Sequence, residues 1–310
     1  MDHPSRLSLM GAEVDVVTPA FVLDFVARRA ATGRRTIVAN HNLHSLYLHA
    51  RRADMRAFYA QAALVEIDST PLIAWAKLMG QKVSRAHRST YLDFRDAFWT
   101  MVQSEGLGVY HVGGAPEVCD RSRAAIWKDY PAVRLDVHSG YFDLHGAGNE
   151  ALLADIAAKR PDILLVGMGM PRQELWILNN LDRLPPCVIM PVGGAFDYEA
   201  GVQYQPPRWT GRLGMEWLAR FVANPGRLFE RYFVEPWALV PQILGDIALR
   251  LSGRGFEVLR APLDDDAILA PWQRRQALSS ETPLPEPAPV IADDGAANEK
   301  PHRILMRGGA

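Results

Sequence analysis

Between about residue 14 and residue 200, short apolar runs alternate with helical patterns of ten or more residues. This alternation is typical of βαβ units, which build a mostly parallel sheet with helices on both faces. The sequence therefore predicts an α/β fold of the Rossmann-like type. The expected strands span residues 35–39, 63–67, 107–112, 133–137, 162–166 and 187–192. The expected helices span residues 19–31, 43–61, 71–80, 90–105, 117–129, 149–160 and 172–180.

The chain changes character after Gly201. Residues 203–260 are rich in Trp, Phe, Arg and Pro and show no strand pattern, so we expect a small helical appendage there. Residues 261–310 contain an aspartate run and a proline-rich stretch with few bulky apolar residues, which predicts a disordered tail. The predicted organisation is thus an α/β core over 1–202, an appendage over 203–260 and a tail.

The overall charge excludes some classes of protein. Lys and Arg total 34 against 35 Asp and Glu, which argues against a bulk nucleic-acid binder. The two cysteines form no CxxC pair, so neither a zinc ribbon nor a disulfide framework is indicated, and a reducing, cytoplasmic setting fits best. We see no signal segment and no apolar run long enough to span a bilayer, so any membrane contact is expected to be peripheral.

Two polar residues follow neighbouring predicted strands. Asn40 comes after the strand at 35–39, and Asp68 comes after the strand at 63–67. In an open α/β sheet, ligands bind at the carboxyl ends of the strands, and a carboxylate there can act as a general base. The alternative is that Asp68 or Ser69 caps the helix that begins near Pro71, which position alone favours because caps are far commoner than bases.

Glycines follow three other predicted strands, at 113–114, 167–169 and 193–194. Glycine allows close backbone approach, and a helix N-terminus favours phosphate, so together they suggest a cleft for a nucleotide or sugar phosphate. Tight turn packing is the alternative. Gly167 and Gly169 lack the third glycine of the dinucleotide fingerprint, and Gln173 and Glu174 in the following helix could serve only as capping and dipole residues.

The remaining candidates are cationic. Arg220, Arg227 and Arg231 are spaced so that a helix would bring them near one face, which could hold a diphosphate or an anionic lipid head group. A solvated basic face is the alternative. The histidines, among them His41 and His44, lack the spacing of a zinc site, so we expect them at the surface or in loops and predict no metal and no cofactor.

These segments resemble the WecG/TagA/CpsF family of glycosyltransferases, also called glycosyltransferase family 26. The resemblance covers about residues 14–245 and is carried by motifs in a specific order. These are Asn40, Asp68, Tyr110–Pro116, Ser139–Phe142, Asp162–Glu174, Val192–Gly201, Pro207–Trp209 and Gly214–Arg220, followed by Arg227 and Arg231.

The resemblance implies an inverting, metal-independent enzyme that moves a sugar from a UDP-sugar onto a polyprenyl-diphosphate-linked sugar at the inner face of the bacterial membrane. It implies that Asp68 is the catalytic base and that the appendage arginines close over the diphosphate and help membrane docking. Independently of the resemblance, an apolar rim that docks on a membrane can equally be buried between two subunits, so a homo-oligomer away from the membrane is a further expectation. The substrate-binding positions it implies are Asn40, Arg85, Gly113, Gly114, Gly169, Gln173, Glu174, Gly194, Asp197, Arg220, Arg227 and Arg231.

The chain departs from the family pattern at three places. Val38 replaces a threonine, Ser69 follows Asp68 in place of glycine, and the segment around Arg88 lacks a glycine-containing turn. These departures bear on the identity of the sugar rather than on the reaction. Residues 41–45 resemble the exopolysaccharide branch, which implies transfer of glucose. The alternatives are transfer of N-acetylmannosamine or its uronic acid, a nicotinamide-dependent oxidoreductase, and a non-catalytic membrane adaptor.

Overall fold

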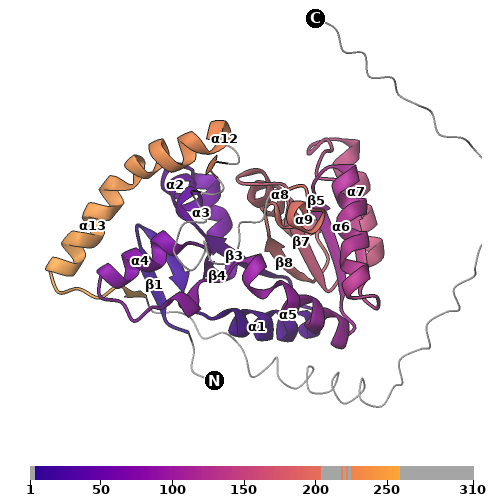
Figure 1. Ribbon diagram of the computed structural model, residues 1–310, viewed down its shortest axis with the longest axis horizontal. Helices are drawn as coiled ribbons and strands as arrows, with labels where there is room; N and C mark the ends of the chain where they lie inside the picture. Colours follow the sequence, from indigo (N-terminus) through magenta and orange to yellow (C-terminus); the bar gives the residue numbers. More distant parts are fainter. Residues whose placement is uncertain (1–3, 204–217, 219–220, 223–224, 259–310) are drawn as a thin grey trace, which may run out of the picture.

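The computed structural model describes residues 4–203, 218, 221–222 and 225–258. Its centre is a six-stranded parallel sheet in the order β4-β3-β8-β7-β5-β6 (Figure 1). This confirms the predicted α/β, Rossmann-like fold. The strands are β3 (Thr36–His41), β4 (Ala62–Ile67), β5 (Gly108–Gly113), β6 (Arg134–His138), β7 (Ile163–Gly167) and β8 (Val188–Pro191).

Helices cover both faces of this sheet (Figure 1). Successive residues of a strand point to opposite faces, so Leu64 joins one apolar cluster and Val65 the other. Both faces are therefore buried, as a parallel sheet requires. The helices of the core are α1 (Pro19–Thr32), α2 (Leu43–Arg51), α3 (Ala53–Ala60), α4 (Thr70–Leu78), α5 (Tyr91–Ser104), α6 (Pro116–Asp129), α7 (Ala147–Lys159), α8 (Arg172–Asn180) and α9 (Ala195–Glu199).

The single helix predicted over 43–61 is wrong, because the structure divides it at Arg52. This residue has extended backbone (φ −122°, ψ 123°) between α2 and α3. Its guanidinium lies 2.6 Å from the Asp54 carboxylate, which also accepts a hydrogen bond from the Met55 amide. An aspartate in the first turn that binds a backbone N–H favours a new helix start at this point.

A second, three-stranded sheet lies beside the main one. It consists of β2 (Ala12–Asp15), β1 (Arg6–Leu9) and β9 (Glu257–Val258), all antiparallel. Only helices were predicted for 203–260, so β9 is a correction. Such a short strand has no detectable sequence period, and its partner lies at the other end of the chain. The sheet is tied to the core through the buried Asp15, which binds Arg6 and accepts a hydrogen bond from the Val65 amide.

The C-terminal part of the described chain is helical, as predicted. It comprises α12 (Pro225–Phe229), a π-helical turn (Glu230–Val234), a 3-10 segment (Glu235–Leu239) and α13 (Val240–Leu251). Leu239 and Phe256 are buried with the residues of β1, β2 and α4 in a third apolar cluster. The predicted tail and Arg220 lie outside the described residues, and so does the side chain of Arg227.

One buried carboxylate anchors α13. Asp246 Oδ2 accepts hydrogen bonds from the Met10 amide (2.9 Å) and from Trp75 Nε1 (2.7 Å). Asp246 is only 6% exposed, and Met10 is buried as well. A single carboxylate oxygen therefore joins the N-terminal hairpin, α4 and α13.

Replacing this carboxylate should destabilise the protein. Asp246→Ala leaves two donors without their partner, and we expect unfolding free energy to fall by roughly 2–4 kcal/mol. Urea unfolding followed by tryptophan fluorescence measures this loss. Asp182→Ala is the matched control, because its side chain is fully exposed and the change should stay within about 0.5 kcal/mol. Equal effects of the two substitutions would contradict the anchoring role.

Candidate functional site

Three neighbouring strands end together at one edge of the sheet. Asn40 and Glu66 are register partners on β3 and β4, and Asn40 Nδ2 donates a hydrogen bond to the Pro191 carbonyl at the end of β8 (3.1 Å). Asp68 lies two residues beyond Glu66, so the strand period directs it to the same face. A cavity of about 50 Å³ opens here. Its lining residues are Asn40, Glu66, Asp68, Ser89, Thr90, Tyr91, Phe94, Met190, Pro191 and Val192.

The structure shows which residue caps the helix that follows Asp68. The N-cap of α4 is Ser69, whose hydroxyl accepts a hydrogen bond from the Leu72 amide. Asp68 is therefore not needed as a cap, and its half-buried side chain faces the cavity. The departure at Ser69 thus has a local structural role. Val38, the departure on β3, is buried in the apolar cluster beneath the cavity.

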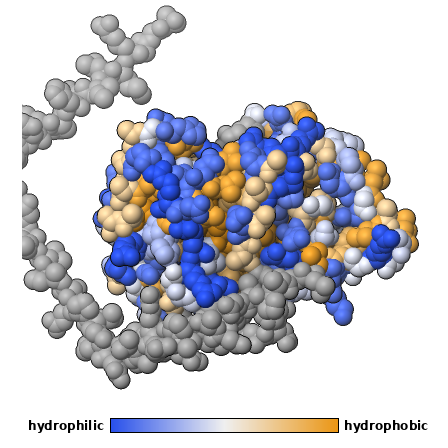
Figure 2. All heavy atoms as spheres, turned by 180° about the vertical axis from the view of Figure 1, so that it is seen from behind, coloured by the Kyte–Doolittle hydropathy of each residue, from blue (hydrophilic) through white to orange (hydrophobic). Residues whose placement is uncertain are grey.

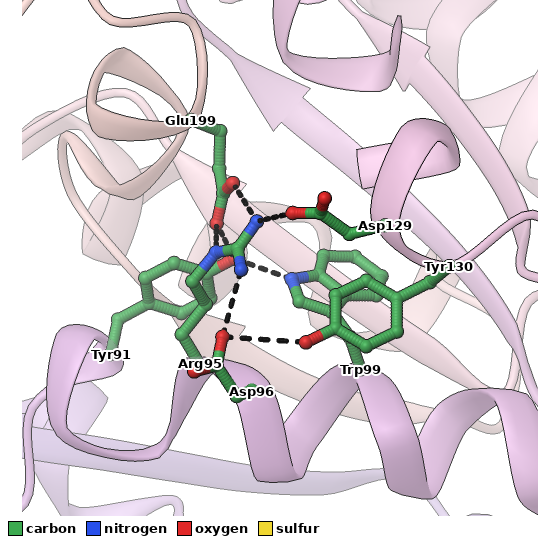
Figure 3. Close-up of polar contacts among 7 residues, drawn as sticks. All are labelled: Tyr91, Arg95, Asp96, Trp99, Asp129, Tyr130 and Glu199. Atoms are coloured by element: carbon green, nitrogen blue, oxygen red, sulfur yellow. Dashed lines mark hydrogen bonds and ion pairs between the residues drawn. The ribbon is translucent and has the colours of Figure 1, made fainter. Parts of the chain in front are cut away.

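An extended network holds the apolar wall of the cavity. The Tyr91 hydroxyl donates to Glu199 (2.6 Å) and accepts a hydrogen bond from Trp99 Nε1 (2.8 Å). Arg95 binds both carboxylate oxygens of Glu199 and also reaches Asp129 (Figure 3). Because its hydroxyl is fully engaged, Tyr91 can offer the cavity only its ring. The network also joins α5 to α9, which follows the third glycine pair.

The glycine-bearing strand ends gather in a second region of the same edge. After β5 the chain continues to β6 on one side, whereas after β7 it continues to β8 on the other, and a doubly wound sheet opens a crevice at such a point. Gly113 and Gly167 are register partners here, and a Cβ on Gly113 would lie 2.3 Å from the Gly167 carbonyl oxygen. Only glycine fits at this contact, so the packing interpretation holds for Gly113.

Gln173 joins two of the glycine loops. Its carboxamide oxygen accepts hydrogen bonds from the Gly169 amide (3.2 Å) and the Gly193 amide (3.1 Å). Its Nε2 donates to Glu174 (2.7 Å), and both side chains are almost completely buried. These N–H groups are therefore already paired. Burial raises the pKa of Glu174 to about 7, and the Gln173 amide offsets part of that rise.

Other predicted positions border the crevice. Gly114 has a positive φ (69°), and a Cβ there would meet Val118, with Asp197 nearby. Gly194 precedes α9, and Asp197 lies within it. The predicted residues thus form two groups that meet at the end of β8. The exception is Arg85, which lies in an exposed 3-10 turn (Arg85–His87) and does not line the cavity.

The expectation that the histidines lie at the surface is wrong for His41. It is fully buried, stacked on Tyr59 with a 3.8 Å ring separation, and bound to Ser45. Tyr59 donates to the Asn40 carbonyl and so supports the strand end. His111 is also buried and stacked on Phe196, and burial lowers its pKa to about 3. Both imidazoles are neutral packing groups beneath the site.

The C-terminal helical segment contacts α2 and its N-cap, just after Asn40. Arg231 Nη2 lies 3.4 Å from Asn42 Oδ1, and Asn42 caps α2 two residues after Asn40. His44 on α2 lies 2.6 Å from the Glu235 carboxylate, and both side chains are mostly buried. Of the three predicted arginines, Arg231 is the one whose side chain is described, and it lies beside the site.

Sequence reasoning missed most of the cavity lining, including the polar residues Glu66, Ser89 and Tyr91. The strand period could have found Glu66, since it shares a face with Asp68. The segment with Ser89 joins the site through backbone pairing of Ser89 with Ile67, which no local pattern reveals. Among the described residues, no cluster of His, Cys, Asp and Glu could hold a metal ion.

The comparisons with known proteins agree with this geometry. The chain is 25% identical over 236 residues to proteins named N-acetylglucosaminyldiphosphoundecaprenol N-acetyl-beta-D-mannosaminyltransferase, found in several Staphylococcus aureus strains, including NCTC 8325 and COL. The aligned region covers 73% of this chain and 88% of each relative. The family description "Glycosyl transferase WecG/TagA/CpsF family" matches residues 7–252. With a match over most of its length, the chain belongs to the WecG/TagA/CpsF family of glycosyltransferases.

Proposed function

We propose that this glycosyltransferase moves an N-acetylmannosaminyl group from its UDP-linked form onto an N-acetylglucosaminyl group carried by a polyprenyl diphosphate. The observation that supports it best is the position of Asp68, which lines a cavity beside Asn40 while Ser69 caps α4. The names of the relatives favour N-acetylmannosamine over the glucose expected from residues 41–45. The reaction is an inverting displacement without a metal ion.

In this reaction the Asp68 carboxylate accepts the proton of the acceptor hydroxyl. The acceptor oxygen forms a bond to the anomeric carbon of the donor, while the bond from that carbon to the diphosphate oxygen breaks. UDP leaves with the bonding electron pair on the opposite side of the sugar. Asp68 occupies the acceptor side, and the glycine crevice between β5 and β7 is the place for the nucleotide.

The departing diphosphate needs compensating charge. The Gly169 and Gly193 amides are engaged by Gln173, so these two donors are not available to the phosphates in this conformation. Arginine is the alternative source, and Arg231 contacts Asn42, which follows Asn40 by two residues. We therefore assign the charge compensation mainly to the appendage arginines.

The acceptor is lipid-linked, and the C-terminal segment offers a surface for the membrane. Val240, Leu244, Ile247 and Leu251 form an apolar stripe on the outer face of α13, and Trp237 is 76% exposed. Figure 2 shows apolar side chains along the rim of the molecule on the α13 side. Among the described residues, no helix has the length and apolar character to cross a bilayer. We propose peripheral docking at the inner face of the membrane through residues 203–260.

The reaction can be tested by UDP release. Purified protein with UDP-N-acetylmannosamine and a short-chain polyprenyl-diphosphate N-acetylglucosamine should release UDP, and Asp68→Asn should lower turnover by about a hundredfold or more. Asp54→Asn, an exposed carboxylate on α3, is the matched control. A donor screen with UDP-glucose and the uronic acid identifies the sugar. Full activity of Asp68→Asn would refute the base, and faster turnover with UDP-glucose would refute the sugar.

Docking can be tested with vesicles that contain phosphatidylglycerol. Changing Trp237, Leu244 and Leu251 together to serine should weaken vesicle binding by at least about tenfold, since each buries apolar area in the bilayer. Activity on a water-soluble acceptor should change little. Leu78→Ser is the control, because Leu78 is an exposed apolar residue on α4 and is not part of the α13 stripe. Unaltered vesicle binding by the triple variant, or its conversion from dimer to monomer, would show that this stripe serves another contact.

A further inference from the structure

Glu66 is a buried carboxyl group that lines the cavity, and in the described part of the chain one of its oxygens has no hydrogen-bond partner. It is 3% exposed, and its Oε2 atom has no partner with hydrogen-bond geometry among the described residues. Within the residues that the structure describes, the Ser89 hydroxyl is also buried without a partner of hydrogen-bond geometry, although it lies near enough to Glu66 to affect its ionisation. Both line the cavity that Asp68 faces. Buried polar groups are normally paired, so two unpaired groups in one cavity indicate that a ligand completes them.

The surroundings of Glu66 keep it uncharged. Asp68, just beyond the end of β4, is a nearby negative charge, and β3 and β8 present uncharged Asn40 and Pro191. Arg88 is paired with Asp93, and Tyr91 on α5 is engaged with Glu199. Burial and Asp68 raise the pKa of Glu66 to about 8, and the Ser89 hydroxyl offsets part of that rise. At neutral pH the two carboxyl groups therefore differ: Glu66 holds a proton that it can donate in a hydrogen bond.

We propose that Glu66 and Ser89 form a polar subsite that holds a hydroxyl group of the acceptor sugar beside the one that Asp68 deprotonates. This rests on the proposed function above. The cavity of about 50 Å³ has room for a few water molecules, which matches the hydroxyl-bearing edge of a sugar rather than a whole ring. Protonated Glu66 donates to the sugar oxygen, and Ser89 either accepts from or donates to it. Glu66 neither gains nor loses its proton during transfer.

Substitutions separate a neutral donor from an anionic group. Glu66→Gln keeps an uncharged donor, so kcat/KM for the acceptor at pH 7 should fall by less than about tenfold. Glu66→Ala should lower it by about a hundredfold, and Ser89→Ala should raise the acceptor KM about tenfold with little change in the donor KM. Glu150→Gln, an exposed carboxylate of α7, is the control. If Gln is as damaging as Ala, or Ser89→Ala acts only on the donor KM, the subsite is refuted.

The pH profile gives an independent readout. In the wild type, kcat/KM for the acceptor should fall as the pH rises through about 8, because ionised Glu66 can no longer donate. Glu66→Gln should lack this decline. The midpoint of thermal unfolding should also fall as the pH rises. The neutral form stabilises the fold fully below about pH 4.5, and this contribution is lost as the pH rises to about 8 in the wild type but not in Glu66→Gln.

Identical pH profiles of kcat/KM in the two proteins would overturn the proposal. The wild type and Asp68→Asn are run in the same assay. Absence of UDP release by the wild type would refute the proposed function. An active wild type in which Glu66→Ala keeps its folded midpoint and full activity would refute only the subsite. Should Glu66→Ala fail to fold, Ser89→Ala and the Glu66→Gln pH profile still decide.

Discussion

The register between β3 and its two neighbours determines where the chemistry lies. Pairing of Asn40 with Glu66 across the β3–β4 ladder, and of Thr36 and Ile37 with β8, brings three strand ends to one level. The period of two then places Asn40, Glu66 and Asp68 on one face. A one-residue shift of β4 would turn both carboxyl groups toward the opposite apolar cluster, where neither could meet a sugar. The hydrogen bonds of Tyr91 and Gln173 then hold side chains and loops in place at the sheet edge that the ladder forms.

The site combines two carboxyl groups in different environments. Asp68 is half-buried and lines the cavity, whereas Glu66 is almost completely buried, and burial together with the Asp68 charge raises its pKa to about 8. Glu174 shows the same effect in the crevice, where burial raises its pKa to about 7. Carboxyl groups that remain protonated near neutral pH add hydrogen-bond donors without adding negative charge. This suits the anionic leaving group of the proposed reaction.

Much of the core could be predicted from the sequence, because its strands and helices have strong periods. The same reasoning placed Asn40 and Asp68 at strand ends, but could not tell whether Asp68 or Ser69 caps the following helix until Ser69 was seen to bind the Leu72 amide. The break at Arg52, strand β9 and the contribution of Ser89 depend on contacts between distant segments, which leave no local pattern. The strand period could have predicted that Glu66 shares a face with Asp68, but its burial depends on how α5 and the segment before it pack.

Asp246 determines the orientation of α13 as well as its stability. Because its carboxylate binds the Met10 amide and Trp75 from the inner side of the helix, α13 cannot roll about its own axis. The outward apolar stripe therefore keeps a fixed orientation relative to Asn40 and Asp68. If that stripe rests on a lipid surface, the entire enzyme is held at one tilt. A sugar carried on a lipid then approaches the cavity along a single direction, and the anchor becomes a determinant of access.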